Sequence, residues 1–174
     1  MTTQVVVMGV AGSGKTTVAE LLAQRAGLEL AEADRFHSPE NIAKMSAGTP
    51  LTDEDRQPWL RSLSEWMRER REAGVATVVA CSALKRSYRD ILREHVPDLN
   101  FVHLHGSKEL VHSRMAGRKG HFMPPALLES QFAALQPLED DEHGITLELT
   151  LSPEELADRA LIWLGLDRNL ETQA

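Results

Sequence analysis

Short apolar runs alternate along the chain with longer stretches in which apolar residues recur every three or four positions. Short apolar runs of this kind are typical of strands buried on both faces of a parallel sheet. Strands that alternate with helices predict βαβ units with right-handed crossovers. The pattern therefore predicts a three-layer α/β fold, with a five-stranded parallel sheet and helices on both faces. The expected strands are 5–8, 28–33, 75–81, 101–105 and 145–149.

Helix signals fall between most of these runs. The segment 16–26 carries apolar residues at helical spacing and is followed by Gly27, and glycine commonly ends helices. Ser-Pro pairs at 38–39 and 152–153 predict helix starts, with serine as the cap and proline at the first helical position. Ligands of parallel sheets bind at the carboxyl ends of the strands, so we expect functional residues directly after each strand.

The segment 9–16 follows the first expected strand and fits the phosphate-binding pattern G-x-x-x-x-G-K-[ST]. Its glycines let the backbone curl so that successive N–H groups point at phosphate oxygens. Lys15 would then neutralise the outer phosphates, and the Thr16 hydroxyl would bind Mg²⁺. The loop opens a helix, whose free N–H groups and dipole favour an anion. An ordinary glycine-rich turn is the alternative, but the context favours a nucleoside triphosphate.

Composition and charge narrow the choice of partners and compartment. The length of 174 residues fits one domain over 1–174, and the net charge of −7 argues against a nucleic-acid partner, which needs a basic face. Cys81 is the only cysteine, so no intramolecular disulfide is expected. No apolar run is long enough to span a bilayer, and the first residues lack the regions of a signal peptide. We therefore expect a cytoplasmic protein without a membrane partner.

Candidate catalytic side chains follow the second expected strand. Asp34 would lie near the Mg²⁺ held by Thr16, where it either orients a metal-bound water or accepts the proton of an attacking hydroxyl. A cap of a turn is the alternative for Asp34. His37 is either a ligand contact or a plain loop histidine.

The next connection is long for a crossover and is interpreted as an inserted substrate-binding lobe at about 36–72. Thr52 is expected to cap a helix whose acidic first turn suits the positive helix end. Asp53 and Arg56 share one face of that helix, so they either contact a ligand or pair with each other. The apolar stripe at 59–67 is expected to pack mostly in the core.

The end of the third strand combines a thiol with two cations. Cys81 is expected to pack rather than to react, because no base lies near it in the sequence. Lys85 and Arg86 begin a helix, where the helix dipole disfavours positive charge unless an anion lies nearby. Lys85 is therefore interpreted as a ligand contact.

Further candidates lie in the second half of the chain. His103 and His105 share one face of a strand, but no further ligand stands at a supporting position, so zinc is not expected. A cationic, glycine-flanked cluster at about 117–126, preceded by Arg114, is interpreted as a lid that closes on the phosphates; a solvated basic turn is the alternative. In the helix that follows, Gln131 is a candidate polar contact.

The segment 141–144 fits D-x-x-G, a switch element of GTP-binding proteins. The chain contains no N-K-x-D for guanine, however. The acidic stretch 139–142 is therefore interpreted as a solvated loop.

The segments that carry a family resemblance are 9–16, Asp34 with Phe36-His37, Asn41 with Lys44-Met45, 48–51, 53–56 with 58–60, 81–85 with 88–90, 118–122, and Gln131-Phe132 with Leu135-Gln136. By these segments the chain from about 5 to 164 resembles the bacterial-type gluconate kinase (gluconokinase) family. The resemblance implies a P-loop kinase fold, similar to that of shikimate and nucleoside monophosphate kinases, with an inserted substrate-binding lobe, a short lid and a homodimer. Ala33 stands where the family often has glycine, and Ser38 shifts the proline that follows it.

The activity that the resemblance implies is transfer of the γ-phosphoryl group of ATP, with Mg²⁺, to the 6-hydroxyl of D-gluconate. The implied catalytic residues are Lys15, Asp34 and Arg118. Thr16 and Asp34 are implied to hold the metal ion. The nucleotide would be bound by Gly12, Ser13, Gly14, Lys15, Thr16, Thr17, Arg114, Arg118 and Pro153. The sugar acid would be bound by His37, Asp53, Arg56, Lys85, His121 and Gln131. The alternatives are a shikimate-type or nucleoside monophosphate kinase and a non-enzymatic nucleotide-dependent switch.

Overall fold

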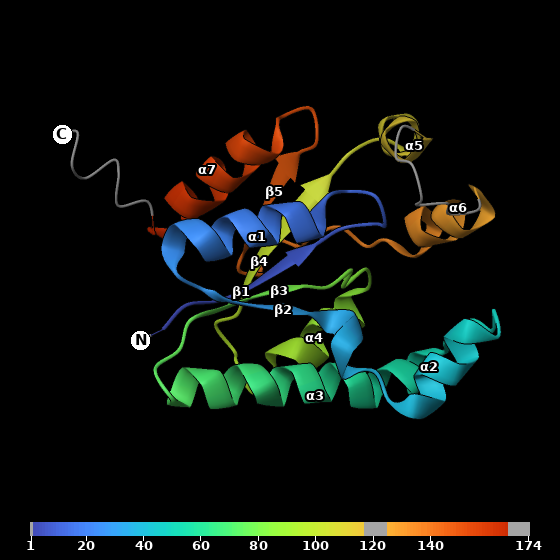
Figure 1. The fold of residues 1–174 in the computed structure, drawn as a ribbon, viewed down its shortest axis with the longest axis horizontal. Helices are drawn as coiled ribbons and strands as arrows, with labels where there is room; N and C mark the ends of the chain where they lie inside the picture. Colours follow the sequence, from blue (N-terminus) through green and yellow to red (C-terminus); the bar gives the residue numbers. More distant parts are fainter. Residues whose placement is uncertain (1, 117–124, 167–174) are drawn as a thin grey trace.

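A computed structural model describes residues 2–116 and 125–166 of the chain (Figure 1). Within these residues the centre is a sheet of five parallel strands in the order β2-β3-β1-β4-β5. The five-stranded parallel sheet predicted from the sequence is confirmed, with differences of one or two residues at the strand ends. The strands are β1 (Gln4–Met8), β2 (Glu29–Glu32), β3 (Thr77–Ala80), β4 (Asn100–His105) and β5 (Gly144–Glu148).

Helices fill the connections between the strands in the described part of the chain. One of them, η1, is a short 3₁₀ helix, and the others are α-helices. They are α1 (Lys15–Ala26), η1 (Ala33–Phe36), α2 (Pro39–Ser46), α3 (Asp53–Glu72), α4 (Arg86–Arg93), α5 (Lys108–Ala116), α6 (Pro125–Ala134) and α7 (Pro153–Leu164).

The helices cover both faces of the sheet, as predicted. α1 and α7 lie together on one face, and α3 and α4 lie on the other (Figure 1). Because side chains alternate along a strand, Val5 and Val7 of β1 face the first pair of helices, whereas Val6 and Met8 face the second. All four side chains are fully buried, which explains why this strand is apolar at successive positions.

The second strand ends earlier than predicted. It stops at Glu32, and the chain then forms η1, which the sequence pattern did not reveal. The carbonyl of Ala33 accepts a hydrogen bond of 2.7 Å from the indole N–H of Trp59 in α3. This hydrogen bond joins the end of β2 to α3, and so helps to fix the position of η1.

The predicted helix caps are confirmed. The Ser38 hydroxyl accepts from the Asn41 N–H at 3.1 Å and begins α2. Thr52 and Ser152 each form a capping box with the acidic residue three positions later, and so begin α3 and α7. These caps satisfy N–H groups that the first turn of a helix leaves without partners.

A buried ion pair joins α4 to the segment before β5. Arg89 and Glu142 have fully buried side chains, and Arg89 donates to the two carboxylate oxygens at 2.8 and 3.2 Å. Arg89 also donates to the carbonyls of Ala83 and Leu84, at 2.8 and 3.3 Å. The pair therefore holds the loop that leads from β3 to Lys85.

The interpretation of 139–142 as a solvated loop is wrong for its last residue. Glu139 to Asp141 are exposed, but Glu142 is buried. Burial alone would raise the pKa of Glu142, and the hydrogen bonds from Arg89 and from the Glu139 N–H lower it below its ordinary value. The sequence could not reveal this role, because the partner lies 53 positions away.

We expect Glu142→Gln to destabilise the fold, because it leaves the Arg89 charge buried without a carboxylate. The expected loss in the free energy of unfolding is about 3 kcal/mol, measured by urea denaturation at pH 7. Glu139→Gln is the matched control, since it removes an exposed carboxylate from the same segment, and its effect should be much smaller. Equal losses in the two variants would contradict the importance of the buried pair.

Candidate active site

The loop after β1 has the backbone of a phosphate cradle. A Cβ at Gly9 would lie 2.7 Å from Ser13 Oγ and 2.9 Å from the Leu104 carbonyl oxygen, so only glycine fits there. Gly14 is the N-cap of α1 with φ 85°, in the left-handed region that favours glycine. The loop thus leads directly into a helix N-terminus, where free N–H groups attract an anion.

Lys15, the first residue of α1, turns back over this loop. Its Nζ donates to the carbonyl oxygens of Gly9 and Val10, both at 3.1 Å. Burial lowers the pKa of Lys15, and the negative charges of Asp34 and Glu32 act in the opposite direction. The predicted catalytic residues Lys15 and Asp34 therefore lie within electrostatic range of each other.

Oxygen atoms suited to Mg²⁺ lie near the loop. The Asp34 side chain is 91% exposed, Thr16 is exposed, and Glu32 Oε1 is buried with no hydrogen-bond partner among the described residues. Mg²⁺ prefers carboxylate, hydroxyl and water oxygens, and usually keeps several waters beside the nucleotide phosphates. These residues fit such an ion, because Mg²⁺ bound beside a nucleotide does not need all its ligands from the protein. The described residues contain no cluster of three or more His, Cys, Asp or Glu side chains that could bind a metal ion by themselves.

His37 lies beside Asp34 in a buried position. Its side chain is 3% exposed, and its Nε2 lies 3.9 Å from Asp34 Oδ1. The ring stacks on the Trp59 indole with centroids 4.1 Å apart, and burial lowers the pKa of His37. Burial and stacking argue against a plain loop histidine. Trp59, expected as core packing, is buried and also forms one wall around the imidazole.

Asp55 fastens α2 to the beginning of α3. Its carboxylate accepts two hydrogen bonds from Lys44 Nζ, at 2.8 and 2.9 Å, and one from the Thr52 N–H. Its carbonyl accepts from Asn41 Nδ2 at 2.9 Å. The hydrogen bonds from Lys44 and Thr52 lower the pKa of Asp55 to about 2. The carboxylate and the carbonyl of Asp55 therefore both join α2 to the beginning of α3.

Four polar side chains form a second cluster at the same end of the molecule. Lys85 Nζ lies 3.2 Å from both carboxylate oxygens of Asp53, and the Tyr88 hydroxyl donates to Asp53. Arg56 donates to the Tyr88 hydroxyl at 3.3 Å and to the Leu51 carbonyl at 2.7 Å. The hydrogen bonds from Tyr88 and Lys85 lower the pKa of Asp53, and Asp53 raises the pKa of Lys85.

This cluster refines three expectations. Asp53 and Arg56 share a helix face, but their side chains form hydrogen bonds with Tyr88, Lys85 and Leu51 rather than with each other. The anion beside Lys85 is Asp53, so a carboxylate of the chain itself already offsets this cation. Tyr88 was not predicted as a site residue, although it lies one helical turn after Lys85 and is among the positions that match the gluconate kinase family.

The remaining candidates lie near the ends of the nucleotide loop and β5. Gln131 Oε1 accepts a hydrogen bond of 2.6 Å from the Ala11 N–H, so it touches the phosphate loop. Arg114 donates to the Leu149 carbonyl, just before Pro153 begins α7. Residues 117–124 of the predicted lid, which include the candidates Arg118 and His121, lie outside the described residues, and 125–126 begin α6.

Two residues weighed for other chemistry are buried. Cys81 is 2% exposed, and burial raises the pKa of its thiol to about 12, in line with packing. His103 is 1% exposed, and burial lowers its pKa to about 4. Neither side chain belongs to the polar clusters described above.

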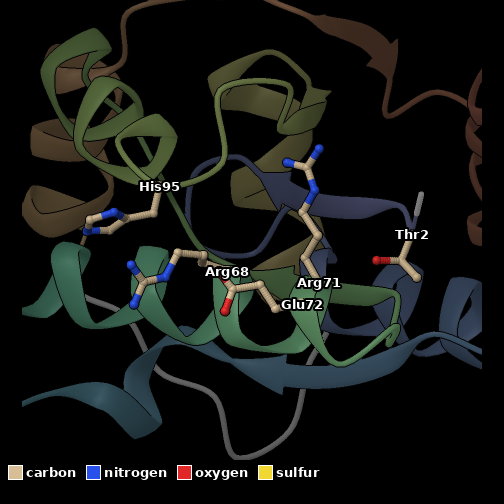
Figure 2. A pocket seen from close by; sticks show the side chains of 5 residues that line it. All are labelled: Thr2, Arg68, Arg71, Glu72 and His95. Atoms are coloured by element: carbon tan, nitrogen blue, oxygen red, sulfur yellow. The ribbon is translucent and has the colours of Figure 1, made fainter.

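A groove lies at the opposite, amino-terminal end of the sheet. It runs along the last turns of α3 and is lined by Thr2, Arg68, Arg71, Glu72 and His95 (Figure 2). Thr2 precedes β1, whereas the phosphate loop follows it. The groove is therefore separate from the candidate active site. Among residues 2–116 and 125–166, none of the helices combines the length and the hydropathy that a membrane-spanning segment needs.

The chain is similar to known kinases over most of its length. A family described as "AAA domain" matches residues 5–138. A gluconokinase from Gluconobacter oxydans is 47% identical, covering 90% of this chain and 88% of its own length. A gluconokinase structure from Sinorhizobium meliloti has a TM-score of 0.85 at 45% identity, covering 99% of this chain and 97% of its own. A sugar kinase structure from Janibacter has a TM-score of 0.89 at 60% identity, covering 96% of both chains.

We expect the contribution of Asp55 to stability to depend on pH. The pKa of this carboxyl is lowered from 3.8 to about 2 in the folded protein, so its contribution is present above pH 4 and is lost as the pH falls through the folded value. Asp55→Asn should lower the urea midpoint at pH 7, and the difference from the original chain should shrink steadily between pH 5 and pH 2. A difference that stays constant with pH would contradict the assignment.

Proposed function

The chain belongs to the gluconokinase family, and on that premise we propose that it transfers the γ-phosphoryl group of ATP to the 6-hydroxyl of D-gluconate. The observation that supports gluconate as the phosphoryl acceptor is the cluster of Asp53, Lys85, Tyr88 and Arg56 at the carboxyl edge of the sheet. Gluconate is an anionic polyol, so its site needs cations for the carboxylate and hydrogen-bonding groups for the hydroxyls. The cluster supplies both.

Phosphoryl transfer asks mainly for positioning and for neutralisation of charge. The N–H groups of the loop, with Gly12, Ser13 and Gly14, bind the phosphates, and Lys15 exchanges its carbonyl contacts for the outer phosphates. Thr16, Thr17, Arg114 and Pro153 complete the nucleotide site, and Arg118 closes over the transferring group. Bound Mg²⁺, held by Thr16 and Asp34 with the phosphates, supplies charge neutralisation.

Asp34 is the residue proposed to accept the proton of the attacking hydroxyl. It is exposed, stands directly after β2 and lies within electrostatic range of Lys15. Lys85 and Arg56 bind the sugar-acid carboxylate, and Asp53, His37, His121 and Gln131 bind hydroxyl groups. Asp53 already neutralises Lys85 in this structure, so binding of the substrate redistributes these contacts rather than filling an isolated cationic pocket.

The wider proposals rest on the family resemblance and on composition. The chain is one domain over 1–174 with a substrate lobe and a lid, acts in the cytoplasm as a homodimer, and needs no nucleic acid or membrane. The identity of 45–47% to proteins named gluconokinase favours gluconate over shikimate, nucleoside monophosphates and a non-enzymatic switch.

One assay tests the function. ADP release is measured with gluconate, shikimate and the nucleoside monophosphates offered in turn, with Mg²⁺ and then with a chelator. We expect stimulation by gluconate alone, loss of turnover with the chelator and recovery when Mg²⁺ is restored. A rate with gluconate no higher than with ATP alone would overturn the proposal.

Asp34→Asn should lower kcat by about 10²–10⁴-fold, because an amide does not accept the hydroxyl proton. Steady-state kinetics with both substrates measure this change. Asp158→Asn is a matched control, since it alters an aspartate that pairs with Arg25 on the surface. Near-normal turnover in Asp34→Asn would remove this residue from the role of base.

Lys85→Met should raise the KM for gluconate by about 10–100-fold, the range expected for losing a hydrogen bond to a charged group. The KM for ATP should stay nearly constant and serves as the internal control. Lys85→Arg, which keeps the charge, should recover part of the affinity. An unchanged KM for gluconate in Lys85→Met would instead indicate that Lys85 serves only to hold Asp53.

A further inference from the structure

The imidazole of His37 is held in one orientation by neighbours on three elements. Its face stacks on Trp59 of α3 with an interplanar angle of 18°. Trp59 is itself fixed, because its indole N–H donates to the Ala33 carbonyl. With 3% of the side chain exposed, the ring has little space to turn. The groups that face its two nitrogens therefore decide which nitrogen carries the proton.

The Nδ1 atom of His37 faces an amide whose orientation the chain determines. Asn41 Nδ2 lies 3.4 Å from Nδ1 and also donates to the Asp55 carbonyl at 2.9 Å. A carbonyl oxygen only accepts hydrogen bonds, so the NH₂ group of Asn41, and not its oxygen, must point this way. The second N–H of the same group is left for His37. Nδ1 must then be the acceptor.

The Nε2 atom faces an acceptor. Asp34 Oδ1 lies 3.9 Å away, and a nitrogen lone pair directed at a carboxylate would be repelled. An N–H at Nε2 makes this contact attractive instead. The two ends of the ring thus favour the same tautomer for independent reasons, one from α2 and one from η1.

We propose that Asn41 is a positioning residue that fixes His37 as the Nε2–H tautomer. The Nε2–H group then faces the Asp34 carboxylate and can donate to a substrate hydroxyl beside it. Asn41 is 5% exposed and acts through His37. Its catalytic consequence rests on the proposed function of Asp34, whereas the tautomer itself does not.

The position of Asn41 is set by the contacts that fasten α2 to α3. Asp55 binds Lys44 through its carboxylate and Asn41 through its carbonyl, and its capping box with Thr52 fixes where α3 begins. Ser38 caps α2 through the Asn41 N–H, so both the backbone and the side chain of Asn41 are held. The amide is therefore placed before any ligand binds.

The first test uses the unaltered protein and needs no turnover. Two-bond ¹H–¹⁵N correlations of the ¹⁵N-histidine-labelled chain distinguish the two neutral tautomers and the protonated ring. The His37 signals are assigned by their loss in His37→Gln, since the chain has 7 histidines. We expect the Nε2–H pattern at neutral pH. An Nδ1–H pattern, a protonated ring or an even mixture would overturn the proposal, whatever the kinase assay shows.

The second test asks whether the tautomer matters to the reaction. Asn41→Leu removes the donor, and we expect a mixed tautomer pattern for His37 and a fall of about tenfold in kcat, the effect of about one lost hydrogen bond. Asn100→Leu is the matched control, because Asn100 Nδ2 also donates to a backbone carbonyl, that of Gln4, at the far end of the sheet. It should leave kcat unchanged. An unaltered tautomer pattern in Asn41→Leu would overturn the role of Asn41.

A pair of substitutions at His37 separates the two nitrogens. The amide N–H₂ of glutamine reaches the place of Nε2, whereas that of asparagine reaches only the place of Nδ1. We expect His37→Gln to retain about tenfold more kcat than His37→Asn, with similar urea midpoints. Equal activity, or the reverse order, would contradict a donor at Nε2. Failure of gluconate to stimulate the unaltered protein would refute the proposed function and leave the tautomer result standing.

Discussion

All strands of the described sheet run parallel, and this one constraint brings the candidate site together. The phosphate loop follows β1, Asp34 follows β2 and Lys85 follows β3, and these three strands are neighbours in the order β2-β3-β1. Their carboxyl ends therefore meet at one edge. Residues far apart in the sequence become the two sides of the candidate site, with the phosphate loop on one side and the proposed acceptor residues on the other.

Two cations that follow β3 are each neutralised by a carboxylate of the chain itself. Lys85 is paired with Asp53, and Arg89 with Glu142. Near a helix N-terminus such cations are unfavourable alone, so the carboxylates make the arrangement stable before a substrate arrives. The net charge of −7 thus says little about the potential inside the site, which depends on these pairs.

The parts predicted from the sequence are those whose signal is local. A few consecutive residues are enough to predict the phosphate loop, the helix caps at Ser38 and Thr52, and the strands. The missed parts depend on partners far along the chain. Tyr88 binds Asp53 across 35 positions, and Glu142 binds Arg89 across 53. The spacing of apolar and polar residues does not reveal such long-range contacts. In an acidic segment, a buried carboxylate cannot be distinguished from an exposed carboxylate until its partner is known.

Several contacts join the elements around the proposed acceptor side of the site. Trp59 holds the end of β2 through the Ala33 carbonyl and also stacks on His37, while Asp55 fastens α2 to α3. Phosphoryl transfer gains most of its rate from holding groups in the right geometry. In such a reaction, residues that never touch the substrate can matter as much as those that do. On the proposed function, the hydrogen bonds around Asp55 and Asn41 contribute to catalysis, because they hold the Asn41 amide beside His37.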